Sequence, residues 1–140
     1  DILTLNSASI PGLDFISTGG SLDRIAKTKT IADYDPAYKY LNVCVTAVEN
    51  DSTCFKCVRT MLTLDALGKL DKFSAVFDVQ YYMNHRKKYI ERMYADGKFG
   101  NDESLLLLFP LFKSELTIRV KISAIIHKVQ NAVRCRIFKR

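Results

Sequence analysis

The sequence lacks the features that would place it in a protein class at once. No apolar run in its 140 residues approaches the roughly 20 residues that span a bilayer, and the longest, over 105–112, is interrupted by Pro110. The chain begins without an initiator methionine and without the charged and apolar regions of a secretory signal. It has no internal repeat and no low-complexity tract. We therefore expect a globular cytoplasmic domain with no membrane span, and we keep open that it is a piece of a longer protein.

Cysteine, histidine and, near the end, acidic residues are scarce. Four cysteines are too few for a disulfide scaffold, and His85 and His127 form no combination that suggests nucleophilic catalysis. Residues 113–140 carry eight Lys or Arg and a single acid, Glu115, whereas residues 1–112 are close to neutral. We therefore divide the chain into a near-neutral globular region and a basic amphipathic C-terminal helix, with the boundary after residue 112.

The hydrophobic pattern predicts a mainly α-helical fold with one or two short strands near the N-terminus. The β-branched run YLNVCVTAV, over 40–48, is the strongest strand prediction, and residues 1–16 are predicted as loop and strand. Helical spacing and capping residues predict the helices, which are expected at about 21–34, 36–41, 54–67, 79–95, a short stretch from 102, and 116–137.

The positions of glycine and isoleucine predict a loop near residue 100 and the packing face of the last helix. The segment ADGKFGND, over 95–102, is predicted as a loop because of its two glycines. The last helix is expected to pack an apolar stripe on the domain, formed by Ile118, Ile122, Ile125, Val129 and Val133.

The Cys-x-x-Cys within NDSTCFKCVRT is the most informative motif. Cys54 and Cys57 open a predicted helix, where two sulfurs can reach one zinc ion and turn amides stabilise thiolates. Cys44, on the predicted strand, could fold back as a third ligand, and Asp51 could be the fourth. A redox pair has less support because the βαβ context of thioredoxin-like proteins is missing. Two reduced cysteines that only pack at a helix start are the plainest interpretation.

The sequence Cys-x-x-Cys-x-Arg-Thr before a leucine-rich helix, with Gly68 and Asp71 beyond it, resembles the tail of PP-loop ATP pyrophosphatases. The resemblance is to the cyano-deazaguanine synthases of queuosine biosynthesis, the QueC or ExsB-like group, over residues 40–71. It implies that Cys44 matches the lone cysteine of a structural zinc site, and that Cys54 and Cys57 match the last two of its Cys-x-x-Cys-x-x-Cys. Asp51 stands where the remaining cysteine is expected.

The resemblance also implies a fold and a phosphate site. The chain would be the C-terminal part of an α/β PP-loop protein, with ATP bound only if a PP-loop domain lies upstream. STGGSLD, over 17–23, is a near miss to the family's Ser-Gly-Gly-x-Asp-Ser loop, although a glycine pair before a helix is also a common turn. The candidate substrate- or phosphate-binding residues are Ser17, Gly19, Gly20, Arg24, Lys27 and Arg59. For Arg59 the alternative is a solvated or ion-paired arginine.

Two basic clusters suggest a different function, the binding of nucleic acid. The first lies among tyrosines and contains Arg86, Lys87, Lys88 and Arg92. The second could contact RNA phosphates, anionic lipid or an acidic partner, and contains Arg119, Lys121, Lys128, Arg134 and Arg136. Aromatic residues that stack on bases are nearly absent from the second cluster.

Three hypotheses follow. In the first, the chain is the C-terminal, substrate-supporting or structural portion of a PP-loop ATP-pyrophosphatase-like enzyme, an ATP-dependent ligase or amidotransferase type. It would not be catalytic without its N-terminal domain. In the second, it is a small helical module that binds nucleic acid. In the third, it is a structural domain that docks on a protein partner.

Overall fold

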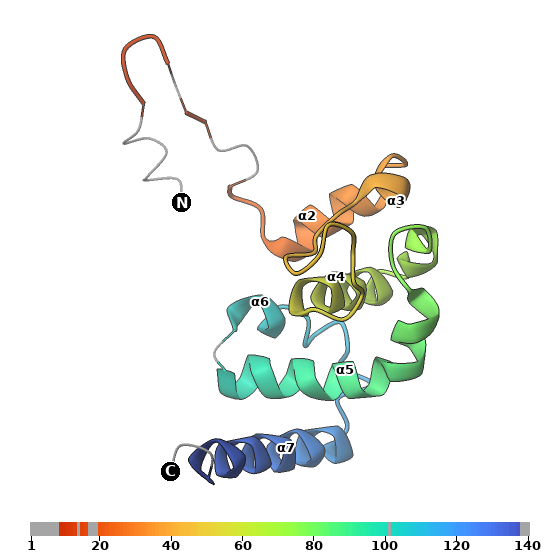
Figure 1. Cartoon of the computed structure of the whole chain (residues 1–140), viewed down its shortest axis with the longest axis vertical. Coiled ribbons are helices and arrows are strands. Elements are labelled where there is room, and N and C mark those ends of the chain that lie inside the picture. Colours follow the sequence, from red (N-terminus) through yellow and green to blue (C-terminus); the bar gives the residue numbers. More distant parts are fainter. Residues whose placement is uncertain (1–8, 14, 17–19, 101, 138–140) are drawn as a thin grey trace.

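The computed structural model is a stack of helical layers (Figure 1). It describes residues 9–13, 15, 16, 20–100 and 102–137, and for His127 and residues 131–137 it describes the backbone alone. The helices are α2 (Arg24–Ala32), α3 (Ala37–Tyr40), α4 (Phe55–Ala66), the 3-10 turn η1 (Leu70–Phe73), α5 (Val79–Gly100), α6 (Glu103–Leu106) and α7 (Ile118–Ile137). The prediction of a mainly helical fold is confirmed.

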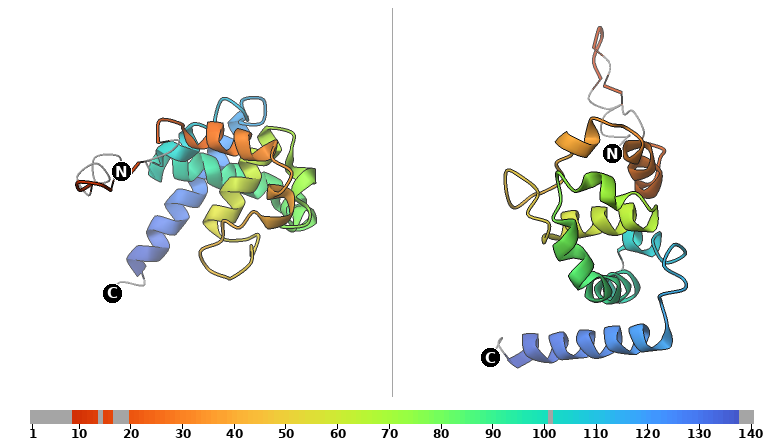
Figure 2. Two further views of the ribbon diagram at one scale, coloured as in Figure 1. Left: turned by 90° about the horizontal axis from the view of Figure 1, so that it is seen from above. Right: turned by 90° about the vertical axis from the view of Figure 1, so that its right-hand side faces the viewer.

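The layers follow the order of the chain. Helices α2 and α3 form one outer layer, α4 lies beneath them with α6 beside it, and α5 lies on the other side of α4 (Figure 1). Helix α7 packs across α5 and forms the opposite outer layer, as the right-hand view of Figure 2 shows. Each layer therefore contacts mainly its neighbours.

Helix α4 is the centre of the core, and its two ends are defined by local hydrogen bonds. Cys54 is the N-cap, and its Sγ accepts from the backbone N–H of Cys57. At the other end Gly68 has a φ of 65°, and the N–H groups of Gly68 and Lys69 donate to the carbonyls of Asp65 and Leu64. This is the Schellman arrangement, which favours glycine because of the positive φ.

The core is formed around α4 by apolar side chains from every layer. Its largest fully buried members are Tyr82, Phe73, Phe112, Met61, Leu62, Leu64 and Leu108. Burying an apolar side chain of this size stabilises a fold by about 1.5–3 kcal/mol, so these residues supply most of the driving force.

The predicted strand over 40–48 is wrong. Residues 41–50 form an irregular loop, and the one bridge in the described part of the chain joins Ile10 to Leu13. The loop's backbone groups bond to nearby side chains instead of a partner strand. Asn42 Oδ1 accepts from the N–H of Cys44, for example, and Asn50 Oδ1 accepts from the N–H of Val43.

The predicted loop over 95–102 is also wrong, since α5 continues to Gly100. A Cβ at Gly97 would lie 3.0 Å from the ring of Phe109, so glycine here lets that ring pack directly on the helix. Tyr94 stacks on the same ring, with centroids 5.2 Å apart. The glycine serves the packing of the segment after α6, and does not break the helix.

Helix α7 packs on the domain through a different face from the one predicted. Val120 and Ala124 are buried, and Ser123 donates to Glu91 of α5. The predicted stripe faces solvent instead, since Ile118, Ile122, Ile125 and Val129 are all exposed. The small side chain of Ala124 lets the two helices approach closely, which a row of isoleucines would not. The side chain of Val133 lies outside the described residues.

An ion-pair network ties the segment before α7 to the core. The Arg86 guanidinium donates from Nε to Asp65 (2.7 Å) and from its two terminal nitrogens to the Glu115 carboxylate. Tyr82 donates to the same Asp65 carboxylate. The hydrogen bonds from Arg86 hold the pKa of Glu115 below its usual range.

We expect Glu115→Gln to lower the free energy of unfolding by about 1 kcal/mol at pH 7, because the network is partly exposed. Since the folded pKa of Glu115 is depressed, its contribution is present above the ordinary glutamate pKa and is lost as pH falls through the folded value. Urea unfolding at several pH values measures both effects. Glu49→Gln, an exposed control, should change little, and equal loss in the two variants would contradict the network's role.

Candidate metal centre

A long loop precedes α4 and is fixed mainly by one side chain. We call residues 41–54 the anchored loop. The Asn50 amide donates to the carbonyls of Leu41 (2.7 Å) and Val76 (3.1 Å). Its oxygen accepts from the N–H of Val43 (2.9 Å) and lies 3.7 Å from Cys57 Sγ. Asn50 therefore joins both ends of the loop to α4 and to the segment before α5.

The two residues after Asn50 complete the turn into α4. Asp51 Oδ1 accepts from the N–H groups of Thr53 (2.9 Å) and Cys54 (2.8 Å), and its Oδ2 accepts from the Thr46 hydroxyl. Ser52 is buried with a φ of 57°, and its Oγ accepts from the N–H of Asp78 (2.8 Å). This left-handed residue lets the chain reverse before the helix begins.

The turn brings four metal-ligating groups together. One ligand atom from each of Cys44, Asp51, Cys54 and Cys57 lies within 4.8 Å of the other three. The Sγ atoms of Cys44 and Cys54 are 3.8 Å apart. Cys44, Cys54 and Cys57 are all free thiols. The four residues can hold a metal ion.

The donor set fits zinc. Tetrahedral zinc with Zn–S bonds of about 2.3 Å separates two sulfurs by about 3.8 Å, which is the spacing of Cys44 and Cys54. Three thiols with a carboxylate are acceptable zinc ligands, although a carboxylate is unusual in a structural site. Asp51 already accepts three hydrogen bonds, but a carboxylate has about four acceptor positions.

The surroundings shift the pKa values of the cluster in different directions. Cys44 Sγ lies 3.2 Å from the Thr46 hydroxyl, whose own proton is donated to Asp51, so the thiol donates to the Thr46 oxygen. The same hydroxyl and the N–H groups of Cys54 and Thr53 hold the pKa of Asp51 well below its usual range. Burial raises the pKa of the Cys57 thiol. A bound cation would oppose that shift, because a coordinating thiol loses its proton.

The predicted phosphate-binding residues are only partly brought together. Arg24 and Lys27 line a hollow of about 320 Å³ between α2, α4 and the anchored loop, together with the hydroxyl residues Thr28 and Thr60. Gly20 lies in an exposed turn before α2, and Asp23 is the N-cap of that helix. Ser17 and Gly19 lie outside the described residues.

Arg59 is buried and holds α6 against α4. Its Nη1 donates to Ser104 (2.9 Å), its guanidinium stacks over Phe55, and its Nε has no partner. Burial and then the positive charge of Arg24 lower its pKa. Neither a solvated nor an ion-paired arginine, the two alternatives considered from sequence, describes this position.

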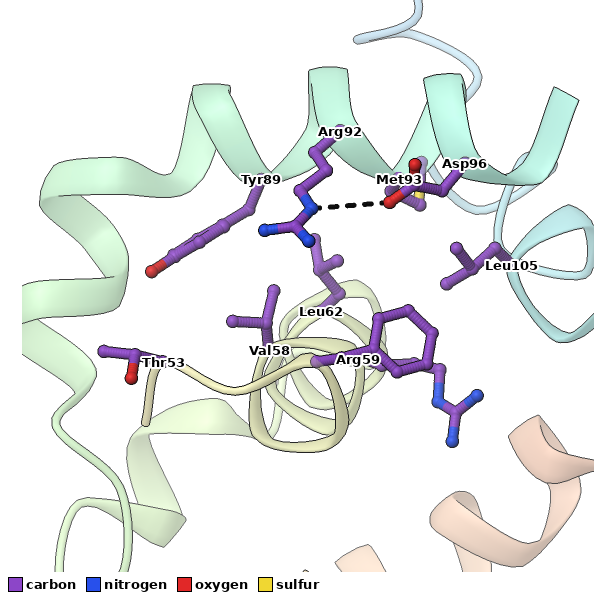
Figure 3. Close-up of a pocket in the computed structure, with 10 residues that line it drawn as sticks. Thr53, Val58, Arg59, Leu62, Tyr89, Arg92, Met93, Asp96 and Leu105 are labelled. Carbon is purple, nitrogen blue, oxygen red and sulfur yellow. Dashed lines mark hydrogen bonds and ion pairs between the residues drawn. The ribbon is translucent and has the colours of Figure 1, made fainter. Parts of the chain in front are cut away.

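A narrow apolar pocket lies between α4 and α5 (Figure 3). Its polar groups are few, and two of them, Arg92 and Asp96, pair with each other across one helical turn. The guanidinium of Arg59 lies away from that pair (Figure 3). The pocket therefore presents no convergent set of polar groups for catalysis.

The two basic clusters differ in how freely their charges are presented. In the first, Arg86 belongs to the network with Asp65 and Glu115, whereas Lys87 and Lys88 are exposed. In the second, Arg119, Lys121 and Lys128 are exposed along α7, while the side chains of Arg134 and Arg136 lie outside the described residues. His85 Nδ1 lies 2.8 Å from the Tyr81 carbonyl and does not reach the cysteines.

Sequence reasoning missed the residues that support the cluster. These residues are Thr46, Asn50 and Ser52, which lie in a segment that the sequence predicts as a strand followed by a turn. The signal that could have found them is the run Asn-Asp-Ser-Thr directly before a helix, where such side chains commonly bond to backbone groups.

Comparisons with known proteins give no relative. No family model matches the chain, and no curated protein or solved structure matches it. The resemblance of residues 40–71 to PP-loop enzymes therefore stays a prediction. Among the helices in the described part of the chain, none has the length and apolar character needed to cross a bilayer.

Asn50→Ala should lower the free energy of unfolding by about 2 kcal/mol, because it leaves two partly buried carbonyls and one N–H group without their partner. Denaturant unfolding in excess chelator would measure this without any contribution from metal. Asn42→Ala, an exposed asparagine in the same loop, is the matched control and should lose less than about 1 kcal/mol. Comparable losses in the two variants would show that Asn50 does not anchor the loop.

Proposed function

We propose that this chain is a zinc-stabilised helical module that supports substrate binding in a PP-loop ATP-pyrophosphatase-like protein and is not catalytic by itself. The observation that carries the proposal is the cluster of Cys44, Asp51, Cys54 and Cys57 within 4.8 Å. The order of these ligands along the chain also supports it. It agrees with a lone cysteine, a gap and a Cys-x-x-Cys at a helix start, as in the QueC-like tails described above.

The zinc would have a structural role. Bound by these four residues, it would fasten the anchored loop to the first turn of α4, and its binding energy would add to the stability of the fold. A bound ion with four protein ligands leaves no open position for a substrate. The module would therefore shape a substrate site without performing the chemistry.

The hollow lined by Arg24 and Lys27 is the surface proposed to face the substrate. Both side chains are exposed, and the hydroxyls of Thr28 and Thr60 lie beside them. The Thr28 hydroxyl donates to the Arg24 carbonyl (2.9 Å), so the two cations and the Thr60 hydroxyl are the groups that suit an anion such as phosphate or pyrophosphate. The anchored loop forms one wall of this hollow through Leu41 and Val43, so loop and hollow are coupled.

A nucleic-acid module is the second candidate and has less support. Arg86, at the centre of the first basic cluster, is committed to two carboxylates. Tyr82 and Tyr89, which could have stacked on bases, are buried. The exposed lysines Lys87 and Lys88 are the observation that keeps this candidate open.

The zinc proposal predicts about one equivalent of zinc in the purified protein by metal analysis. Cys44→Ser and Cys54→Ser should each lower the content severalfold, whereas Cys135→Ser, a cysteine outside the cluster, should not. Asp51→Cys should make the zinc harder to remove with a chelator, because it restores a fourth thiolate. Wild-type protein with less than about a tenth of an equivalent of zinc would refute the proposal. If only the Asp51→Cys variant bound zinc, Asp51 would mark a zinc site that the wild-type protein has lost.

The substrate-side proposal predicts that pyrophosphate binds the protein weakly and that Arg24→Gln with Lys27→Gln weakens binding by about tenfold or more. Isothermal titration calorimetry measures this. Lys29→Gln, also on α2 but outside the hollow, is the control and should bind normally. Equal binding by the double variant and the control would contradict this role and leave the zinc proposal untouched.

A further inference from the structure

Helix α7 packs on the domain through one side only. Val120 is 6% and Ala124 1% exposed, and the helix contacts α5. At about 100° per residue, these two residues share one face of the helix with Ser123, which donates to Glu91. These contacts hold α7 in place along its first turns.

The opposite side of α7 is a continuous apolar face. It is formed by Ile118 (75% exposed), Ile122 (51%), Ile125 (47%), Ile126 (50%) and Val129 (56%). These positions lie within about a third of the helix circumference, centred opposite Val120. Single exposed apolar residues are common on protein surfaces, but five on one helical face indicate that something covers them.

Cations flank this apolar face on both sides. Lys121 and Lys128 lie along one border and Arg119 along the other, all exposed. Residues 118–137 contain no aspartate or glutamate. Among the ion pairs of the described residues, none includes these three cations. Their charge is therefore available to an anionic partner.

The position of α7 makes this face accessible to a flat surface. The helix is the outermost layer, and it crosses α5 obliquely at one edge of the molecule (Figures 1 and 2). Its 20 residues extend for about 30 Å, and no other described element lies beyond it in these views. A planar partner can contact the exposed apolar face from Ile118 to Val129 at once.

We propose that α7 binds an anionic lipid surface, lying in the plane of the interface with its isoleucine face among the acyl chains. An apolar face bordered by lysine and arginine is the composition that suits this position. The lysines and the arginine would meet the headgroups as the apolar side chains enter the interface. The apolar face is opposite the surface that packs on α5, so binding requires no unfolding of the domain.

Charge and polarity decide against two other occupants. A second copy of the chain would place two helices without acidic residues against each other, and their like charges would repel. Nucleic acid would use the cations but would leave the isoleucines exposed to water. A lipid surface uses both features.

Co-flotation with vesicles tests the proposal on the whole chain. The protein should float with vesicles of phosphatidylcholine and phosphatidylglycerol, and much less with phosphatidylcholine alone. Ile122→Ser with Val129→Ser should weaken binding by about tenfold or more, and Lys121→Gln with Lys128→Gln by a similar factor. The changed side chains are exposed, so circular dichroism should show that these variants remain folded.

Two control variants carry the same kinds of substitution at exposed positions outside α7. Val48→Ser removes an exposed apolar residue, and Lys29→Gln with Lys56→Gln removes two exposed lysines; both should bind as the wild type does. Absence of binding to anionic vesicles would overturn the proposal. Unchanged vesicle binding by the Ile122→Ser, Val129→Ser variant would also overturn it. So would a wild-type protein that does not bind vesicles and sediments as a dimer, if the same double substitution makes it a monomer.

Discussion

The side chain of Asn50 is the constraint on which the candidate site depends. The anchored loop has no strand partner, so its backbone groups need other hydrogen-bonding partners. Asn50 satisfies the carbonyls of Leu41 and Val76 and the N–H of Val43 with one amide. This arrangement sets the distance between Cys44 and the start of α4, and hence the geometry of the four ligand groups.

The same loop links the metal cluster to the basic hollow. Leu41 and Val43 line the hollow, while Cys44, the residue directly after Val43, belongs to the cluster. A metal ion that fixes the loop would therefore also fix one wall of the hollow. This coupling is why a structural zinc and a substrate-supporting role form one proposal.

The sequence predicts the helices well and the connections poorly. Cys54 and Gly68 bound α4 as expected, because capping and a positive φ are local effects. The run over 40–48 has strand composition but no neighbouring strand to pair with, and β structure requires a partner that composition cannot supply. Gly97 reads as a helix breaker, and only its contact with Phe109 explains why the helix continues.

The candidate site shows the same division. The spacing of Cys44, Asp51, Cys54 and Cys57 could be recognised in the sequence, since a Cys-x-x-Cys at a helix start has a characteristic local geometry. The burial of Arg59 against α6 could not, because Ser104 lies far away in the chain. The direction of the isoleucine face of α7 also depended on tertiary contacts. A helix has two long faces, and the side chains on α5 decide which one packs.

X-ray absorption at the zinc edge would identify the ligands of the cluster, because it reports the atoms bound to the metal. Ligation by Cys44, Asp51, Cys54 and Cys57 predicts about three sulfurs near 2.3 Å and one oxygen near 2.0 Å, with the oxygen replaced by sulfur in Asp51→Cys. A shell of nitrogen and oxygen alone, or four sulfurs in the wild type, would contradict the assignment of Asp51 and its three cysteines as the ligands.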